Sequence, residues 1–145
     1  MKDKEFYIER FYYEHKLYYD TALREIKNGR KSSHWIWYIF PQLKILGSSE
    51  KAIYYGIENA EEAKAYYDDH YLGEKFREIC RALLDCKSSN PFEVMGYPDN
   101  MKLQSSMTLF YMATEDELFK KVLDKFYDGK TDEKTVSYLQ SAGLI

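Results

Sequence analysis

An apolar stripe at helical spacing runs through residues 74–86, and it constrains the fold more than any other feature. Its members recur at steps of three and four residues: Phe76, Ile79, Cys80, Leu83 and Leu84. This period places them on one side of an α-helix. A second stripe lies just before Gly129 and consists of Leu118, Val122, Leu123 and Phe126. Helices with one apolar side bury it against other helices or a sheet, so the chain is expected to pack around a core.

Residues that begin helices are spread along the chain. Asn59, Asn90 and Asp132 have side chains that cap a helix N-terminus, and each precedes a segment with helical character. Thr114 and Glu117 have the spacing of a capping box, which predicts a helix starting at residue 115. These cap residues predict several short helices along the chain.

The first forty residues are also predicted to be mainly helical. The period of the apolar residues predicts a helix over residues 3–28, which Gly29 ends. Ser32–Ser33 offer caps to the apolar run 34–40, although its period alone fits a helix or a buried strand. No Asn-Gly or Asp-Gly pair separates two alternating runs, so no hairpin is indicated. We predict an all-α fold, a compact single-domain bundle (1–145) of about seven or eight helices, several of them short.

Composition excludes several classes of protein. The chain has 145 residues with 21 basic and 24 acidic side chains, a net charge of −3 that does not suit a duplex-DNA binder. No apolar run approaches 18 residues, and the charged first ten residues lack an apolar signal core, so neither a membrane span nor secretion is expected. Cys80 and Cys86 are six residues apart, too far for a disulfide within one helix, which predicts reduced thiols in a cytoplasmic protein.

One candidate functional stretch is SHWIWYIFPQ, residues 33–42. It combines polar side chains with two tryptophans in an otherwise apolar run, and basic residues stand just before it. Backbone N–H groups at the start of this element, together with those basic side chains, suit an anion such as phosphate. The alternative is that the tryptophans belong to the core and that the histidine has an ordinary hydrogen bond. The candidate ligand-binding residues here are Arg30, Lys31, Trp35, Trp37 and Gln42, with His34 as a candidate catalytic acid or base.

The second candidate stretch is DNMKLQSSMTLF, residues 99–110. On a helix, Lys102, Ser105 and Ser106 are neighbours, and Asp99 lies one turn before the lysine. A buried lysine can act as general base for a serine nucleophile, so Lys102 and Ser106 are candidate catalytic residues, with Asp99 and Ser105 as ligand contacts. The alternative is structural: an aspartate that caps the helix and small serines that allow close packing.

No cofactor or metal motif is present. His15, His34 and His70 are isolated and have no metal-ligand spacing, so no metal site is predicted. The GRKSS segment lacks the earlier glycine that a P-loop requires. We therefore predict no cofactor.

These motifs together resemble the bacterial "domain of unknown function 1810" family, which is sometimes labelled calpastatin-like. The matching segments are residues 29–43, 46–57, 62–73 and 99–110, with Arg10–Phe11, Ala22–Leu23, Phe126–Gly129 and Asp132 at the two ends. The resemblance implies a compact, mainly helical domain and carries no established activity. The calpastatin label does not fit, because calpastatin is a disordered inhibitor and 45% of this chain is hydrophobic. Glu14 and His15 stand where the family usually has a small residue and a glutamine.

Two functions from different classes follow from these observations. The first is a pocket for a small anionic or nucleotide-like ligand, such as an ADP-ribose derivative, built from both motifs; whether it catalyses a reaction stays open. The second is a non-catalytic module that binds a protein partner through its tyrosines, of which the chain has 15. The two differ in whether both motifs border one cleft or the aromatic residues form an open patch.

Overall fold

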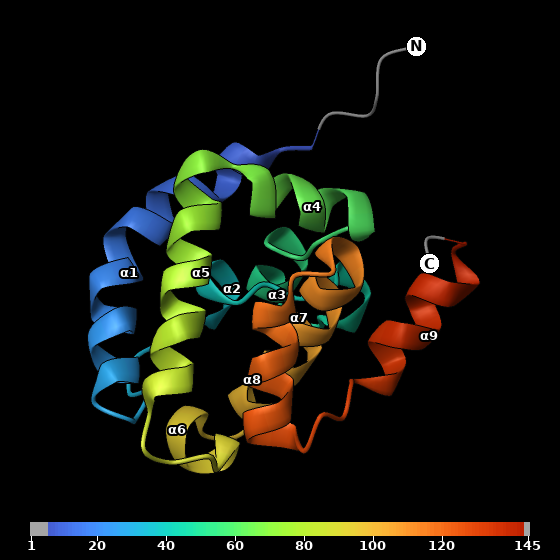
Figure 1. Ribbon diagram of the computed structural model, residues 1–145. Helices are drawn as coiled ribbons and strands as arrows, with labels where there is room; N and C mark the ends of the chain where they lie inside the picture. Colours follow the sequence, from blue (N-terminus) through green and yellow to red (C-terminus); the bar gives the residue numbers. More distant parts are fainter. Residues whose placement is uncertain (1–5, 144–145) are drawn as a thin grey trace.

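The computed structural model describes residues 6–143, and over that range the prediction of an all-α fold is confirmed (Figure 1). Two 3₁₀ turns, η1 (Ile8–Phe11) and η2 (Lys44–Leu46), accompany nine α-helices. The helices are α1 (Tyr12–Lys27), α2 (Ile36–Ile39), α3 (Glu50–Tyr54), α4 (Ala60–Asp68), α5 (His70–Asp85), α6 (Pro91–Met95), α7 (Asp99–Thr114), α8 (Glu117–Tyr127) and α9 (Glu133–Ser141). Within the described range, strand-like pairing is confined to one isolated bridge between Leu43 and Ile57.

The long helices form the body of the bundle. α5 lies between α1 and α8, and α7 packs against α4 and α8 (Figure 1). α6 packs against α7 at one end, while α9 follows α8 and contacts α7. The short elements from α2 to α3 lie between α1 and α7, so the two motifs singled out in the sequence occupy neighbouring parts of the fold.

Aromatic side chains fill the centre of the bundle. Phe76 of α5 lies edge-on to Phe110 of α7, with ring centroids 4.5 Å apart, and Phe119 of α8 is 5.2 Å from Phe76. Tyr66 of α4 is completely buried, and its hydroxyl donates to the carbonyl of Tyr38 at 2.7 Å. Such ring pairs add about 0.5–1.5 kcal/mol each beyond the area they bury. Much of the chain's aromatic content is therefore core.

Several predicted helix starts are confirmed by hydrogen bonds. Asn59 accepts from the Glu62 amide at 2.9 Å, Asn90 from the Phe92 amide at 2.9 Å, and Asp132 from the Thr135 amide at 3.0 Å. These bonds satisfy amide groups that the first turn of a helix leaves without a partner.

Helix α5 begins earlier than its apolar stripe indicates. Asp69 caps it by accepting from the Leu72 amide at 2.9 Å, so Gly73 falls inside the first turn. A Cβ at Gly73 would lie 2.0 Å from the Tyr67 carbonyl oxygen, so only glycine allows this close approach of α4 and α5.

Two of the predicted caps are wrong. Ser33 does not cap α2: its hydroxyl donates to Glu25 at 2.5 Å, and α2 begins after Trp35 without a side-chain cap. Thr114 and Glu117 form no capping box. The helix starts at Glu117, where Asp116 accepts from the Leu118 amide at 2.9 Å. Both side chains have other partners: the Ser33 hydroxyl donates to Glu25, and the Thr114 hydroxyl donates to the Phe110 carbonyl.

The first helix begins later than predicted, and both cysteines can be assigned. Residues 3–5 lie outside the described part of the chain, and residues 8–11 form a 3₁₀ turn before α1 begins at Tyr12. Both cysteines are free, as expected. Among the described residues no helix is long and apolar enough to cross a membrane, and no group of three or more metal-ligating side chains occurs.

Candidate functional site

The carboxylate of Glu25, near the end of α1, organises the loop that leads into the first motif. It accepts hydrogen bonds from the Ser32 amide at 2.8 Å, the Ser33 amide at 3.0 Å and the indole N–H of Trp35 at 2.9 Å. The Ser33 hydroxyl donates as well. The reversal of the chain before this loop is made by Gly29, whose φ of +83° suits glycine.

These hydrogen bonds keep Glu25 ionised. Burial alone would raise the pKa of the carboxyl, but the bonds from Ser33, Ser32 and Trp35 favour the charged form and lower its pKa to about 2. Glu25 is therefore a fixed negative charge around which the loop folds. The sequence did not indicate this role, because Glu25 lies within an ordinary helical pattern near the end of α1.

Lys31 ties the loop to the second motif. Its ammonium group forms an ion pair with Asp99 at 2.7 Å and lies 4.7 Å from the centroid of the Trp35 ring. Its backbone amide donates to the carbonyl of Val94 at 2.7 Å. Lys31 is only 6% exposed at its side chain, so it acts as a bridge between the loop and the start of α7.

A hollow of about 330 Å³ opens where these segments meet. Both sequence motifs border it, together with the turn before α7. Its lining consists of Lys31, Ser32, Ser33, His34, Ile36, Trp37, Met95, Tyr97, Pro98, Asp99 and Lys102. Five of the ten candidate site residues are therefore brought together, from segments about sixty residues apart in the sequence: Lys31, His34, Trp37, Asp99 and Lys102.

Lys102 is the cation in this hollow with the weakest attachment. Its ammonium group is 3.9 Å from Asp99, whose closer partner is Lys31, and 5.6 Å from the centroid of the Trp37 ring. The Trp37 indole N–H is buried and has no hydrogen-bond partner among the described residues. A lysine with free donors beside an aromatic wall is suited to an anion attached to a flat ring.

Two candidate residues face the core instead. Trp35 is completely buried, with its indole held by Glu25. Ser105 is buried and donates to the Met101 carbonyl at 3.1 Å within its own helix. Neither borders the hollow, because on α7 and around the loop these positions turn toward the centre of the bundle.

The predicted pairing of Ser106 with Lys102 is not formed. Ser106 is completely buried, and its hydroxyl has no hydrogen-bond partner among the described residues. A serine nucleophile must contact its general base, and Ser106 forms no hydrogen bond to Lys102 and does not line the hollow. Helical spacing correctly made the two residues neighbours along α7, but it could not show that one of them points into the core.

The last two candidates lie at the margin. Arg30 is exposed and does not line the hollow. Gln42 borders a narrow passage of about 10 Å³ behind Trp37 and Lys102, and the bridge between Leu43 and Ile57 fixes its backbone. Tyr97, which does line the hollow and is 71% exposed, was missed because it belongs to neither motif.

The fold and this hollow define a small all-α protein with a polar, aromatic-walled depression between two loops. The family model described as protein of unknown function (DUF1810) matches residues 5–139. The chain belongs to this family, in agreement with the resemblance seen in the sequence.

A solved structure shares the fold. It is the conserved hypothetical protein Rv1873 from Mycobacterium tuberculosis, 40% identical, with a TM-score of 0.89; the match covers 92% of this chain and 96% of that one. No significant match is found among the curated proteins.

Proposed function

We propose that the protein binds a small anionic, nucleotide-like ligand in the hollow between α2 and the start of α7. The observation that carries this proposal is that segments far apart in the sequence contribute Lys31, His34, Trp37, Asp99 and Lys102 to one hollow of about 330 Å³. A concave site with an aromatic wall and a few convergent polar groups is the usual form of a small-molecule site.

Each residue has a distinct role in this proposal. Trp37 provides a flat wall for a ring, and Lys102 contacts the anionic group. Asp99 and Lys31 position each other through their ion pair of 2.7 Å, and they hold the two motifs together. His34 is exposed at the rim and can donate to the ligand or exchange a proton with it. Binding is the function proposed; His34 is the residue through which it would extend to catalysis.

The proposal predicts that Lys102→Met weakens ligand binding without unfolding the protein. AMP is a suitable probe, since it joins a flat ring to a phosphate. The wild-type protein is expected to bind AMP and to melt several degrees higher when the ligand is in large excess. Loss of a charge-assisted contact should weaken binding by about tenfold or more. Isothermal titration and thermal melts measure both effects.

Lys121→Met is the matched control, because Lys121 is an exposed lysine of α8 that does not line the hollow. It should leave AMP binding unchanged. The site proposal is wrong if Lys102→Met destabilises the protein by about 1–3 kcal/mol while binding AMP normally, since that pattern marks a structural hydrogen bond.

A protein-binding module is the second candidate, and the exposed tyrosines bear on it. Tyr13 and Leu17 of α1 are 74% and 59% exposed and lie one turn apart, which is the kind of pair an interface uses. Tyr97 and Tyr54 are exposed as well, but each lines a depression and does not belong to an open aromatic patch with Tyr13. This scatter favours the ligand site. Lack of binding to any nucleotide, with a partner lost on Tyr13→Ala, would favour the module.

A further inference from the structure

A second, larger depression is separated from the hollow by the narrow space behind Trp37. This groove, of about 910 Å³, is bordered by η1, η2 and α3. Its lining consists of Phe6, Tyr7, Arg10, Lys44, Glu50, Lys51, Ile53, Tyr54, Tyr55, Gly56, Glu58 and Glu62. Rings and an isoleucine dominate its exposed surface: Tyr7 is 62% exposed and Tyr54 52%.

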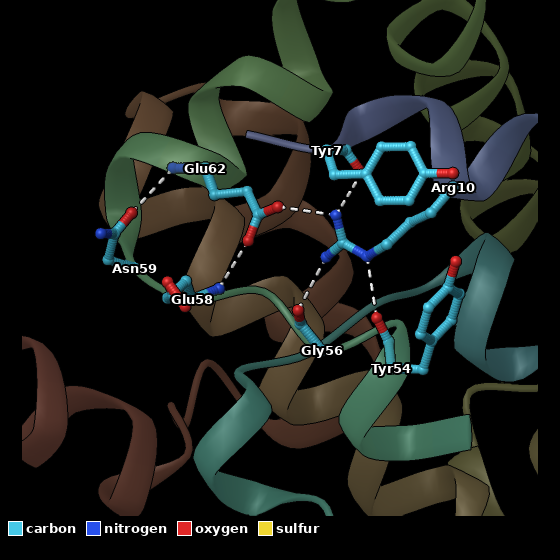
Figure 2. Close-up of polar contacts among 7 residues, drawn as sticks. All are labelled: Tyr7, Arg10, Tyr54, Gly56, Glu58, Asn59 and Glu62. Carbon is cyan, nitrogen blue, oxygen red and sulfur yellow. Dashed lines mark hydrogen bonds and ion pairs between the residues drawn. The ribbon is translucent and has the colours of Figure 1, made fainter. Parts of the chain in front are cut away.

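Arg10 lines one side of the groove, and hydrogen bonds hold its side chain in place. Its guanidinium donates to the Tyr54 carbonyl at 2.8 Å and the Gly56 carbonyl at 2.9 Å, and it pairs with Glu62 at 2.8 Å (Figure 2). Glu62 also accepts from the Glu58 amide at 2.7 Å (Figure 2). Because these bonds use the arginine's donors, its charge is neutralised by Glu62 and serves the fold. Arg10 contacts Tyr7 and Tyr54 through their backbone carbonyls, so the rings of these tyrosines remain available to a ligand.

The narrow space behind Trp37, of about 10 Å³, lies between the groove and the hollow and shares lining residues with both. It shares Tyr55 and Gly56 with the groove, and it shares Trp37 and Lys102 with the hollow. A Cβ at Gly56 would lie 2.4 Å from the Cα of Lys44, so this glycine allows the two chain segments to close on the passage. The three spaces are therefore adjacent, and Trp37 and Lys102 form a partition between them.

Two lysine side chains flank Trp37 at this partition. The ammonium groups of Lys51 and Lys102 lie 5.0 Å and 5.6 Å from the centroid of the same Trp37 ring. Lys51 borders the groove and Lys102 the hollow. Two cations that border the same depressions are paired with carboxylates, Lys31 with Asp99 and Arg10 with Glu62, whereas Lys51 is exposed. An anionic group is therefore favoured between the two aromatic-walled spaces.

We infer that the hollow and the groove are the two ends of one site, which takes a ligand with two flat or ring-shaped ends joined by an anionic linker. This is the chemistry of a dinucleotide or of ADP-ribose, with the diphosphate between Lys51 and Lys102. The inference rests on the proposed function. The space behind Trp37 holds only about 10 Å³, so the Lys102 side chain, which is 27% exposed and attached by its 3.9 Å ion pair, moves outward to pair with the linker.

The test compares AMP with ADP-ribose by isothermal titration. ADP-ribose is expected to bind about tenfold or more tightly than AMP, because its second end reaches the groove. Tyr54→Ala should remove that advantage and leave AMP binding within twofold, and its backbone carbonyl still accepts from Arg10. Lys51→Met should weaken ADP-ribose binding more than AMP binding. Lys121→Met serves again as the control.

The outcomes separate this inference from the proposed function. The inference is overturned if AMP and ADP-ribose bind with equal affinity and neither Tyr54→Ala nor Lys51→Met changes those affinities. The ligand site would then end at Trp37, and the proposed function of the hollow would remain. If neither ligand binds, the proposed function fails and the inference fails with it. Circular dichroism of each variant confirms that a lost affinity does not reflect unfolding.

Discussion

Replacing Glu25 with alanine is expected to destabilise the protein by about 3–4 kcal/mol, because several buried donors would lose a charged acceptor at once. The side chain accepts four hydrogen bonds, from the Ser32 and Ser33 amides, the Ser33 hydroxyl and the Trp35 indole. Among residues 6–143, Glu25 is the only side chain of α1 with hydrogen bonds both to the loop and to Trp35, so the hollow should lose its shape as well. Urea unfolding at pH 7 measures the change.

Two milder variants sharpen this test. Glu25→Gln keeps the shape of the side chain and one acceptor oxygen, so it should cost less than Glu25→Ala. Ser33→Ala removes a single hydroxyl donor and should cost about 1 kcal/mol. If Glu25→Ala destabilised no more than Ser33→Ala, the carboxylate would not be the centre of this loop.

Acidification from pH 7 to pH 5 is expected to lower the stability by about 2 kcal/mol through His15 alone. Its ring is 1% exposed, stacks on Tyr19 with centroids 5.2 Å apart, and has Nδ1 3.1 Å from the Tyr71 hydroxyl. Burial, with a smaller contribution from the charge of Lys75, lowers the pKa of His15 to about 3.

The sign follows from this depressed pKa. An unfolded chain protonates His15 near pH 6.5 while the folded protein keeps it neutral, so each pH unit below 6.5 costs about 1.4 kcal/mol until the folded pKa is reached. Protonation of Glu25, whose pKa is lowered to about 2, begins to reduce the stability only below about pH 4.5. Between pH 6.5 and pH 5, the expected loss of stability therefore comes from His15 and not from Glu25.

Urea unfolding of the His15→Phe variant tests this prediction. Phenylalanine keeps an aromatic ring beside Tyr19 and cannot titrate, so its stability should be nearly level between pH 7 and 5. His70→Gln is the matched control, because the His70 side chain is 96% exposed; it should retain the wild-type loss. Equal pH dependence in wild type and His15→Phe would show that His15 is not the group responsible.

Sequence patterns predicted the long helices well, because their signals are local. The stripe on α5 and the caps at Asn59, Asn90 and Asp132 each depend on residues three or four positions apart. The failures came where a long-range partner competes with a local one. Ser33 could cap a helix, but it donates to Glu25 on another element instead.

The candidate site was predicted in part for the same reason. Polar residues inside apolar runs pointed to His34 and Lys102, and the fold brings both to one hollow. Spacing alone could not tell that Ser106 turns inward, since the burial of a helix position depends on which neighbours pack there. Lys51 gave no signal of its own, because its place beside Trp37 is fixed by the tertiary fold.

The most direct measurement of the central claim is a two-dimensional ¹H–¹⁵N NMR titration with AMP that follows the two tryptophan indole signals. The Trp35 indole is buried and bonded to Glu25, while Trp37 lines the hollow. Trp37→Phe assigns the signals by removing one of them. Binding in the hollow predicts a saturable shift of the Trp37 signal and little change at Trp35. An unmoved Trp37 signal at millimolar AMP would contradict the account.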